Sequence, residues 1–146
     1  MTETETTETI KSPLEIGIER YNAGESYDTL IPYFSQLAAT KSKDSAALLT
    51  CLTWLYLLDN QPAKALKSAQ KAYKLNARDP QTLINLSLAM LENKSKGVRQ
   101  HIDMVQEMCL KVPEIKQEIK ETLEEGLTRK PDWQNLVKVK DWLFNI

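Results

Sequence analysis

Glycine and proline are scarce in this chain, with 4 glycines and 6 prolines among 146 residues. A protein of many short strands needs frequent tight turns, and these two residue types supply most of them. Valine, isoleucine and threonine also never alternate cleanly with polar residues over the length of a strand. The composition therefore argues against a β fold and predicts an all-α protein.

The chain also lacks an excess of charge and a long apolar run. Its formal net charge is −1 at pH 7, so no global charge attracts it to nucleic acid or to an anionic membrane. Its longest apolar stretch, residues 46–58, is too short to span a bilayer and contains Thr50 and Thr53. The N-terminus has no basic start followed by an apolar run, as a secretory signal would. We therefore expect a soluble, cytoplasmic protein with no membrane span.

No constellation of catalytic or metal-binding residues is present. His101 is the only histidine, and we expect it to be exposed or half-buried on a helix, without the spacing of a metal site. No glycine-rich phosphate loop, nucleophile elbow or Cys/His cluster occurs. Cys51 and Cys109 fit buried free thiols in a reducing compartment better than a structural disulfide. The sequence thus predicts neither an enzyme nor a bound cofactor or metal.

Residues 1–11 form a tract of threonine and glutamate with a single apolar residue beyond Met1. Such a tract buries too little apolar surface to offset the entropy that a chain loses on ordering. We therefore predict that residues 1–11 are disordered. The remaining residues, 12–146, are long enough to build a core of their own and are predicted to form a single domain.

The most informative stretch is 45–80, which predicts two antiparallel helices joined by a turn at residues 59–62. One face of the first helix carries large side chains at helical spacing: Leu48, Leu49, Leu52, Leu55 and Tyr56. A second apolar stripe lies beside it, at Cys51, Trp54 and Leu58. A surface helix needs only one such stripe, so two indicate burial on two sides or a half-exposed binding face.

The second helix of this hairpin has small residues on one face, at Ala65, Ala69 and Ala72. Alanine lets two helix backbones approach closely, while Leu66 and Tyr73 fill the space beside the contact. Pro62 suits the first turn of this helix, where its missing N–H leaves no bond unmade. The opposite face is rich in lysine and is predicted to point to water.

These residues resemble the tetratricopeptide repeat, a helical hairpin of about 34 residues. The matching positions are Leu49, Leu52, Thr53 and Tyr56 on the first helix and Ala65, Ala69 and Ala72 on the second. The chain departs from the family pattern where Leu49 replaces a tryptophan, Ala69 an aromatic residue and Ala77 the terminating proline. The resemblance implies antiparallel helix hairpins stacked in a right-handed superhelix.

Flanking segments repeat this plan. Before the central hairpin, residues with an offset of 35 positions match Tyr56, Ala65, Ala69 and Ala72: these are Tyr21, Leu30, Phe34 and Leu37. After it, residues with an offset of 34 positions match Leu49, Leu52, Thr53 and Tyr56: these are Leu83, Leu86, Ser87 and Met90. We therefore place three repeats at about 12–44, 45–79 and 80–112. Pro32 conflicts with the second helix of the first repeat, for which we expect a late start or a kink.

Two further helices follow, so the chain is expected to have about eight. Ile115, Ile119 and Leu123 define an amphipathic helix that Gly126 is predicted to end as its C′ residue. The several glutamates and lysines of this helix are interpreted as surface ion pairs. Residues 128–131 are predicted to form a turn, and residues 132–144 a last helix. The resemblance implies that helices within 113–146 cap the array.

The first helices of such repeats line a concave groove in the family. The resemblance therefore predicts a partner-binding groove at Ala47, Thr50, Trp54, Leu57, Ile84, Asn85, Leu88 and Leu91. This groove is expected to bind a helix or an extended apolar peptide of another protein. The alternative is that the last helix, with its tryptophans and Phe144, folds back and fills the groove. Either way we expect a protein–protein interaction module: an adaptor, an assembly factor or a chaperone-like escort.

A second surface carries a basic stripe at Lys64, Lys67, Lys71, Lys74 and Arg78. Nucleic-acid contact through this stripe is the alternative function. A solvated helix face is the simpler interpretation, because no aromatic residue interleaves with the cations to stack on bases.

Overall fold

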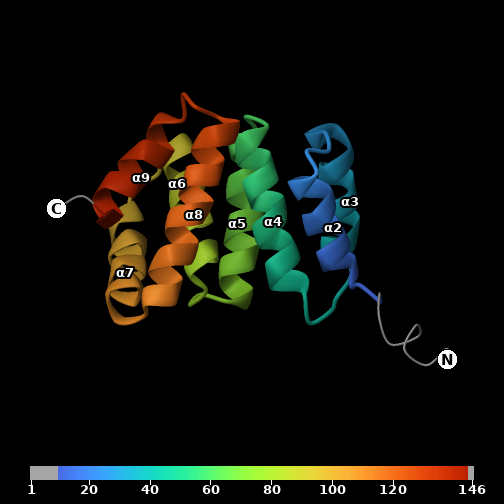
Figure 1. Cartoon of the computed structure of the whole chain (residues 1–146), viewed down its shortest axis with the longest axis horizontal. Helices are drawn as coiled ribbons and strands as arrows, with labels where there is room; N and C mark the ends of the chain where they lie inside the picture. The colour runs from blue at the N-terminus through green and yellow to red at the C-terminus, as the bar shows by residue number, and fades with distance from the viewer. Residues whose placement is uncertain (1–9, 145–146) are drawn as a thin grey trace.

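The computed structural model describes residues 10–144, and within that range the chain forms eight helices and no strand (Figure 1). The prediction of an all-α fold is confirmed. The helices are α2 (Pro13–Asn22), α3 (Tyr27–Ala39), α4 (Ser45–Leu58), α5 (Pro62–Leu75), α6 (Pro80–Glu92), α7 (Val98–Lys111), α8 (Pro113–Arg129) and α9 (Gln134–Phe144). Residues 1–9 of the predicted disordered tract lie outside the described residues. None of the described helices has the length and apolar character that a membrane crossing requires.

Local sequence explains where most of these helices begin. Four of the prolines open a helix, at the start of α2, α5, α6 and α8. At the start of α2, Ser12 and Glu15 form a reciprocal capping box. At the start of α6, the Asp79 carboxylate accepts a hydrogen bond from the Thr82 backbone N–H at 2.9 Å. The two caps satisfy backbone N–H groups that a helix start leaves without partners, and each proline removes one such group.

Consecutive helices pack against one another in antiparallel pairs, and the first and last described helices, α2 and α9, lie at opposite ends of the stack (Figure 1). The pairs α2–α3, α4–α5 and α6–α7 fall within the predicted repeats. The last pair is arranged differently. Helix α8 contacts α6, α7 and α9, and α9 contacts α6, α7 and α8, so both return over the stack instead of extending it.

The alanine stripe of α5 is the closest contact in the central hairpin. Ala65, Ala69 and Ala72 are at most 1% exposed, and the Thr53 and Ser68 hydroxyls meet across the same interface at 2.7 Å. The Thr53 hydroxyl is also within hydrogen-bond distance of the Leu49 carbonyl, so its polar atom does not remain unpaired in the core. Small side chains thus bring α4 and α5 together, as the sequence predicts.

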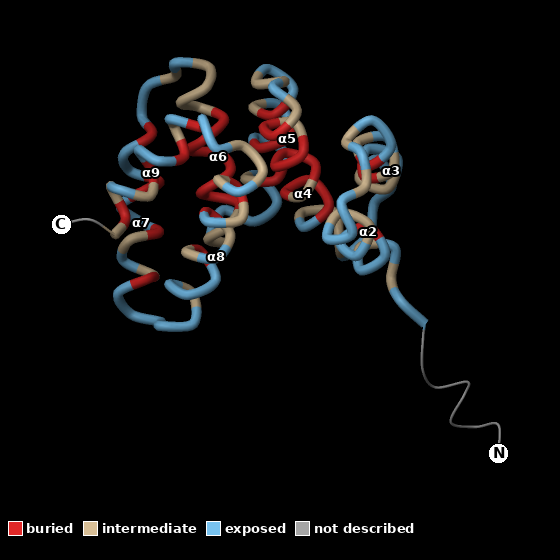
Figure 2. The backbone as a smooth tube through the Cα atoms, turned by 45° about the horizontal axis from the view of Figure 1, so that its top comes forward, coloured by how far each residue is buried: buried red, intermediate tan, exposed pale blue. Residues whose placement is uncertain are grey.

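Burial is concentrated in the middle of the stack, above all along α4 and α6 (Figure 2). The larger apolar cluster joins α4, α5, α6 and α7 to both C-terminal helices. A smaller cluster holds α3 on α4, through Leu30, Phe34, Leu48, Leu52 and Leu55. The first repeat is therefore attached to the rest mainly through the α3–α4 contact, which leaves the facing side of α2 open.

The predicted late start of the helix around Pro32 is wrong. Helix α3 begins at Tyr27, where the Ser26 hydroxyl accepts the Asp28 N–H at 3.2 Å. Leu30 and Phe34 are buried on either side of the proline and hold the helix in place. Pro32 and Asp28 are both exposed, so water can solvate the Asp28 carbonyl that a proline nitrogen cannot bond.

The predicted helix end at Gly126 and the turn at 128–131 are also wrong, since α8 continues to Arg129. Gly126 serves close packing instead. A Cβ at this position would lie 2.8 Å from Leu136 Cδ1 and 2.9 Å from the Trp54 ring. The last helix begins at Gln134, so Trp133 precedes it and is buried beneath the loop, at 2% exposure.

Candidate binding groove

The C-terminal helices cover part of the predicted partner-binding stripe. Leu57, Ile84 and Leu88 are at most 2% exposed and belong to the cluster that includes residues of α8 and α9. The Trp133 ring lies against the Trp54 ring, with centroids 5.3 Å apart. These three residues are therefore buried inside the chain's own core and are not exposed to a partner. Ala47 is exposed and Leu91 is half-buried.

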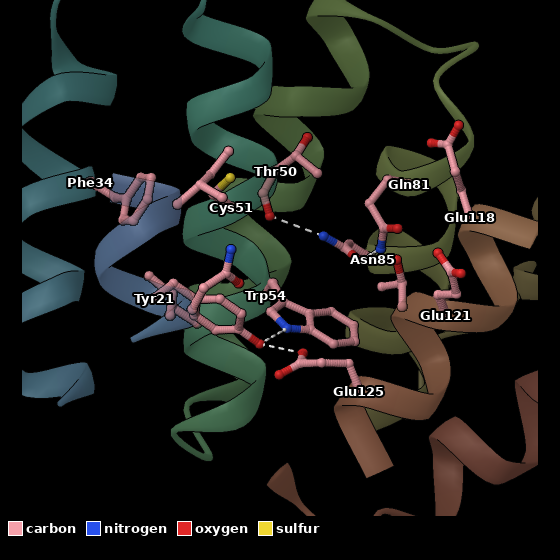
Figure 3. Close-up of a pocket in the computed structure, with 14 residues that line it drawn as sticks. Tyr21, Phe34, Thr50, Cys51, Trp54, Gln81, Asn85, Glu118, Glu121 and Glu125 are labelled. Carbon is pink, nitrogen blue, oxygen red and sulfur yellow. Dashed lines mark hydrogen bonds between the residues drawn. The ribbon is translucent and has the colours of Figure 1, made fainter. Parts of the chain in front are cut away.

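The other part of the concave face stays open as a cavity of about 430 Å³ between α2, α4, α6 and α8 (Figure 3). Of the predicted stripe, Thr50, Trp54 and Asn85 line it. The remaining lining residues are Ile18, Tyr21, Asn22, Phe34, Cys51, Leu55, Gln81, Glu118, Glu121, Thr122 and Glu125. We call this cavity the groove. It is of the size and mixed character that protein binding sites have: an apolar floor with a few polar groups at the sides.

The polar groups between α4 and α6 are already bonded to each other. The Asn85 amide donates to the Thr50 carbonyl at 2.9 Å and accepts from the Gln81 amide at 2.7 Å. The Thr50 and Thr82 hydroxyls meet at 2.9 Å. Asn85 is only 1% exposed. This side chain therefore fixes the spacing of the two helices, and the half-buried Gln81 is the polar group at the groove's edge.

One end of the groove is closed by a side-chain cluster that joins α2 to α8. The Tyr21 hydroxyl donates to Glu125 Oε1 at 2.6 Å and accepts from Trp54 Nε1 at 2.9 Å. Arg129 pairs with Glu125, donates to the Tyr21 carbonyl at 2.7 Å and lies 3.7 Å above the Tyr21 ring. Burial and the Glu125 hydrogen bond raise the pKa of Tyr21, which keeps its hydroxyl protonated as a donor.

The walls that α2 and α8 contribute are not evident from the sequence pattern. The sequence predicts surface ion pairs for Glu118, Glu121 and Glu125, and of these three only Glu125 forms one among residues 10–144, with Arg129. Their spacing of three and four residues does place them on one face of a helix. Nothing in the sequence indicates that this face looks onto Trp54 and Asn85, because that depends on how α8 folds back over the stack.

The basic stripe lies on a different surface. Lys64, Lys67, Lys71, Lys74 and Arg78 are all exposed, as predicted for a face that points to water. The first three line a second cavity, of about 410 Å³, together with residues of α3 and α4 that include Tyr56. Nucleic-acid contact through this surface stays a prediction.

The other residues that the sequence singled out show no metal-site geometry. Within residues 10–144 no group of three or more His, Cys, Asp or Glu side chains could hold a metal ion. His101 is more buried than predicted, at 8% exposure, because its ring packs edge-on against Tyr73 at 5.3 Å. Burial lowers the pKa of His101 and keeps it neutral near pH 7. Cys51 and Cys109 are free thiols, as predicted.

The Cys51 thiol is a probe of the groove, since burial there raises its pKa to about 11. Only the thiolate is alkylated. The rate of iodoacetamide modification of Cys51, followed by mass spectrometry, is therefore expected to rise about tenfold for each pH unit until the pH nears about 11. The same chain unfolded in urea is the control, and its rate should level off at the ordinary cysteine pKa. A folded-state rate that levels off at that same pH would contradict the burial.

The groove is therefore a preformed cleft between helices. A comparison of the chain with models of known protein families finds no match, and a comparison with curated protein sequences finds none either. The assignment of a function therefore depends on the geometry and chemistry of the groove itself.

Proposed function

We propose that this chain is a protein-binding module of the tetratricopeptide-repeat type, and that its groove holds a segment of another polypeptide. The observation that supports this most is the open cavity of about 430 Å³, which has an apolar floor and is lined on one side by α8 without being filled by it. An exposed apolar hollow is unfavourable in water unless something fills it. The chain would act as an adaptor, an assembly factor or a chaperone-like escort.

The rigid surroundings of the groove favour the binding of a ligand. Its side chains come from four helices of the stack and from α3, and the Tyr21–Glu125–Arg129 cluster fixes the distance between two of its walls. A preformed site loses little conformational entropy when a ligand binds. The free thiols Cys51 and Cys109 support a reducing compartment, such as the cytoplasm, as the place of action.

A matched pair of isoleucines on α2 tests this proposal. Ile18 and Ile16 are each 40% exposed, but only Ile18 lines the groove. Random peptides of about a dozen residues, displayed on phage, are selected on the immobilised chain. Peptides selected in this way should bind the Ile18→Asn variant roughly tenfold more weakly, because the contact area of one half-exposed isoleucine is lost.

Two controls accompany this measurement. The Ile16→Asn variant makes the same chemical change outside the groove and should bind as the unmodified chain does. A bound peptide should also slow alkylation of Cys51, since that thiol lies on the groove floor. Failure to enrich any peptide, or peptides that bind both variants equally and leave the Cys51 rate unchanged, would show that the groove is not a peptide site.

A further inference from the structure

The charges that line the groove are all of one sign. Glu118, Glu121 and Glu125 line its α8 wall, and no lysine, arginine or histidine is among the lining residues. The chain as a whole carries a net charge of only −1, so this wall is a local departure from a balanced surface. A charged wall beside an apolar floor selects partners by the sign of their charge as well as by their shape.

The three carboxylates differ in how far other residues of the chain neutralise them. Glu125 is paired with Arg129 and bonded to Tyr21. Glu121 accepts only a neutral amide hydrogen bond, from Gln117 at 3.0 Å. Glu118 has no hydrogen bond or ion pair within the part of the chain that the structure describes. Two negative charges therefore remain without a cationic partner at the side of the groove where Gln81 also lies (Figure 3).

We propose that the groove recognises a cationic segment of its partner: a lysine or arginine that pairs with Glu118 and Glu121, next to an apolar side chain that lies on the floor. The floor for this side chain is formed by Ile18, Cys51 and Leu55. Such a pairing neutralises the wall, whereas an acidic segment would add to its charge. This inference rests on the proposed function, and it names the chemistry of the partner.

The polar groups at the edge of the groove suit the backbone of that segment. Asn22 on α2 is exposed and its side-chain amide has no hydrogen bond within residues 10–144, and Gln81 on α6 uses its amide N–H to bond Asn85. The Gln81 oxygen and both ends of the Asn22 amide are available to peptide N–H and C=O groups. The chain's own first nine residues contain three glutamates, so they have the wrong sign to occupy the groove.

The test uses the peptides selected on the unmodified chain. These are expected to be rich in lysine or arginine close to an aliphatic or aromatic residue. Each of Glu118→Gln and Glu121→Gln should weaken binding of such a peptide roughly twofold to fivefold, the upper part of the range for an exposed ion pair. The affinity should also fall as salt is raised, since salt screens exposed charges. Fluorescence anisotropy of a labelled peptide measures both effects.

Two comparisons make the test specific for charge at the groove. Glu124 is exposed on α8 but does not line the groove, so Glu124→Gln should leave the affinity unchanged. The double variant Glu118→Lys with Glu121→Lys should reject the selected peptide and bind a version in which its lysines are replaced by glutamates. Because all these positions are exposed, the variants are expected to fold as the unmodified chain does.

The outcomes separate this inference from the proposed function. If the selected peptides need Ile18 but show no preference for cations, or bind equally well after the charge reversal, the groove binds peptides and the cationic preference is wrong. If no selected peptide depends on Ile18, both the cationic preference and the proposed function are wrong. Rescue of the reversed variant by the acidic peptide would establish the pairing.

Discussion

Replacing Trp133 with alanine is expected to lower the free energy of unfolding by about 3–5 kcal/mol, as for other large aromatic residues removed from a core. Trp133 is 2% exposed and lies against Trp54, with ring centroids 5.3 Å apart. Its indole N–H donates to Glu92 at 2.9 Å. It therefore joins the start of α9 to both α4 and α6, and its loss leaves a cavity where three helices meet.

The same change should expose those residues of the predicted partner-binding stripe that are buried in the intact protein. Leu57 and Leu88 would then be accessible to an apolar dye such as anilinonaphthalene sulfonate, whose fluorescence is expected to rise while most of the helical circular dichroism is kept. Urea denaturation followed by circular dichroism measures the loss of stability.

Trp142 provides the control for this measurement. It is half-buried, with Arg99 and Lys138 above its ring, and the hydrogen bond from Gln106 goes to its backbone carbonyl, which alanine keeps. The Trp142→Ala variant should lose only about 1 kcal/mol. Equal losses for the two tryptophans would contradict the role given to Trp133.

Replacing Gly126 with valine is expected to lower the free energy of unfolding by about 3 kcal/mol. Helix propensity alone predicts the opposite, a gain in stability. Glycine within a helix normally weakens it, so a larger residue should help. Here the first added carbon would lie 2.8 Å from Leu136 Cδ1 and 2.9 Å from two atoms of the Trp54 ring. The Trp54 ring cannot move aside easily, because it is bonded to Tyr21 and packed on Trp133.

Thermal and urea denaturation of Gly126→Val and Thr128→Val measure this difference. Thr128 is exposed on the same helix, so its replacement by the similarly shaped valine should change stability by no more than about 0.5 kcal/mol. Gly126→Ala should fall between the two, since the smaller clash is partly offset by better propensity. A Gly126→Val variant as stable as the unmodified chain would mean that α8 and α4 are not in close contact.

The positions of the helices could be predicted because their causes are local. A proline at the first helical residue, or an Asp79 that caps its own helix, acts within one turn of chain. The alanine stripe of α5 was recognisable for the same reason, since spacing along one helix is visible in the sequence. The late start predicted at Pro32 was wrong because apolar contacts of Leu30 and Phe34 with neighbouring helices hold α3 together across the proline.

Gly126 shows where local reasoning ends. Glycine is favoured both at helix ends and where two helices approach closely, and the sequence does not distinguish these uses. The choice depends on Trp54 and Leu136, which are distant in the chain and adjacent in space. For the groove likewise, Thr50, Trp54 and Asn85 could be named from the pattern of one hairpin repeated in the next.

By itself the sequence determined an all-α chain, the start of most helices and which face of most helices is apolar. These properties depend on backbone hydrogen bonds and side-chain spacing within a few residues. Only the tertiary structure decided that α8 and α9 return over the stack, covering Leu57 and Leu88 while leaving the groove open with a wall of glutamates. That outcome depends on which apolar faces pack best against one another across the whole chain, a competition between distant segments that no single stretch of sequence contains.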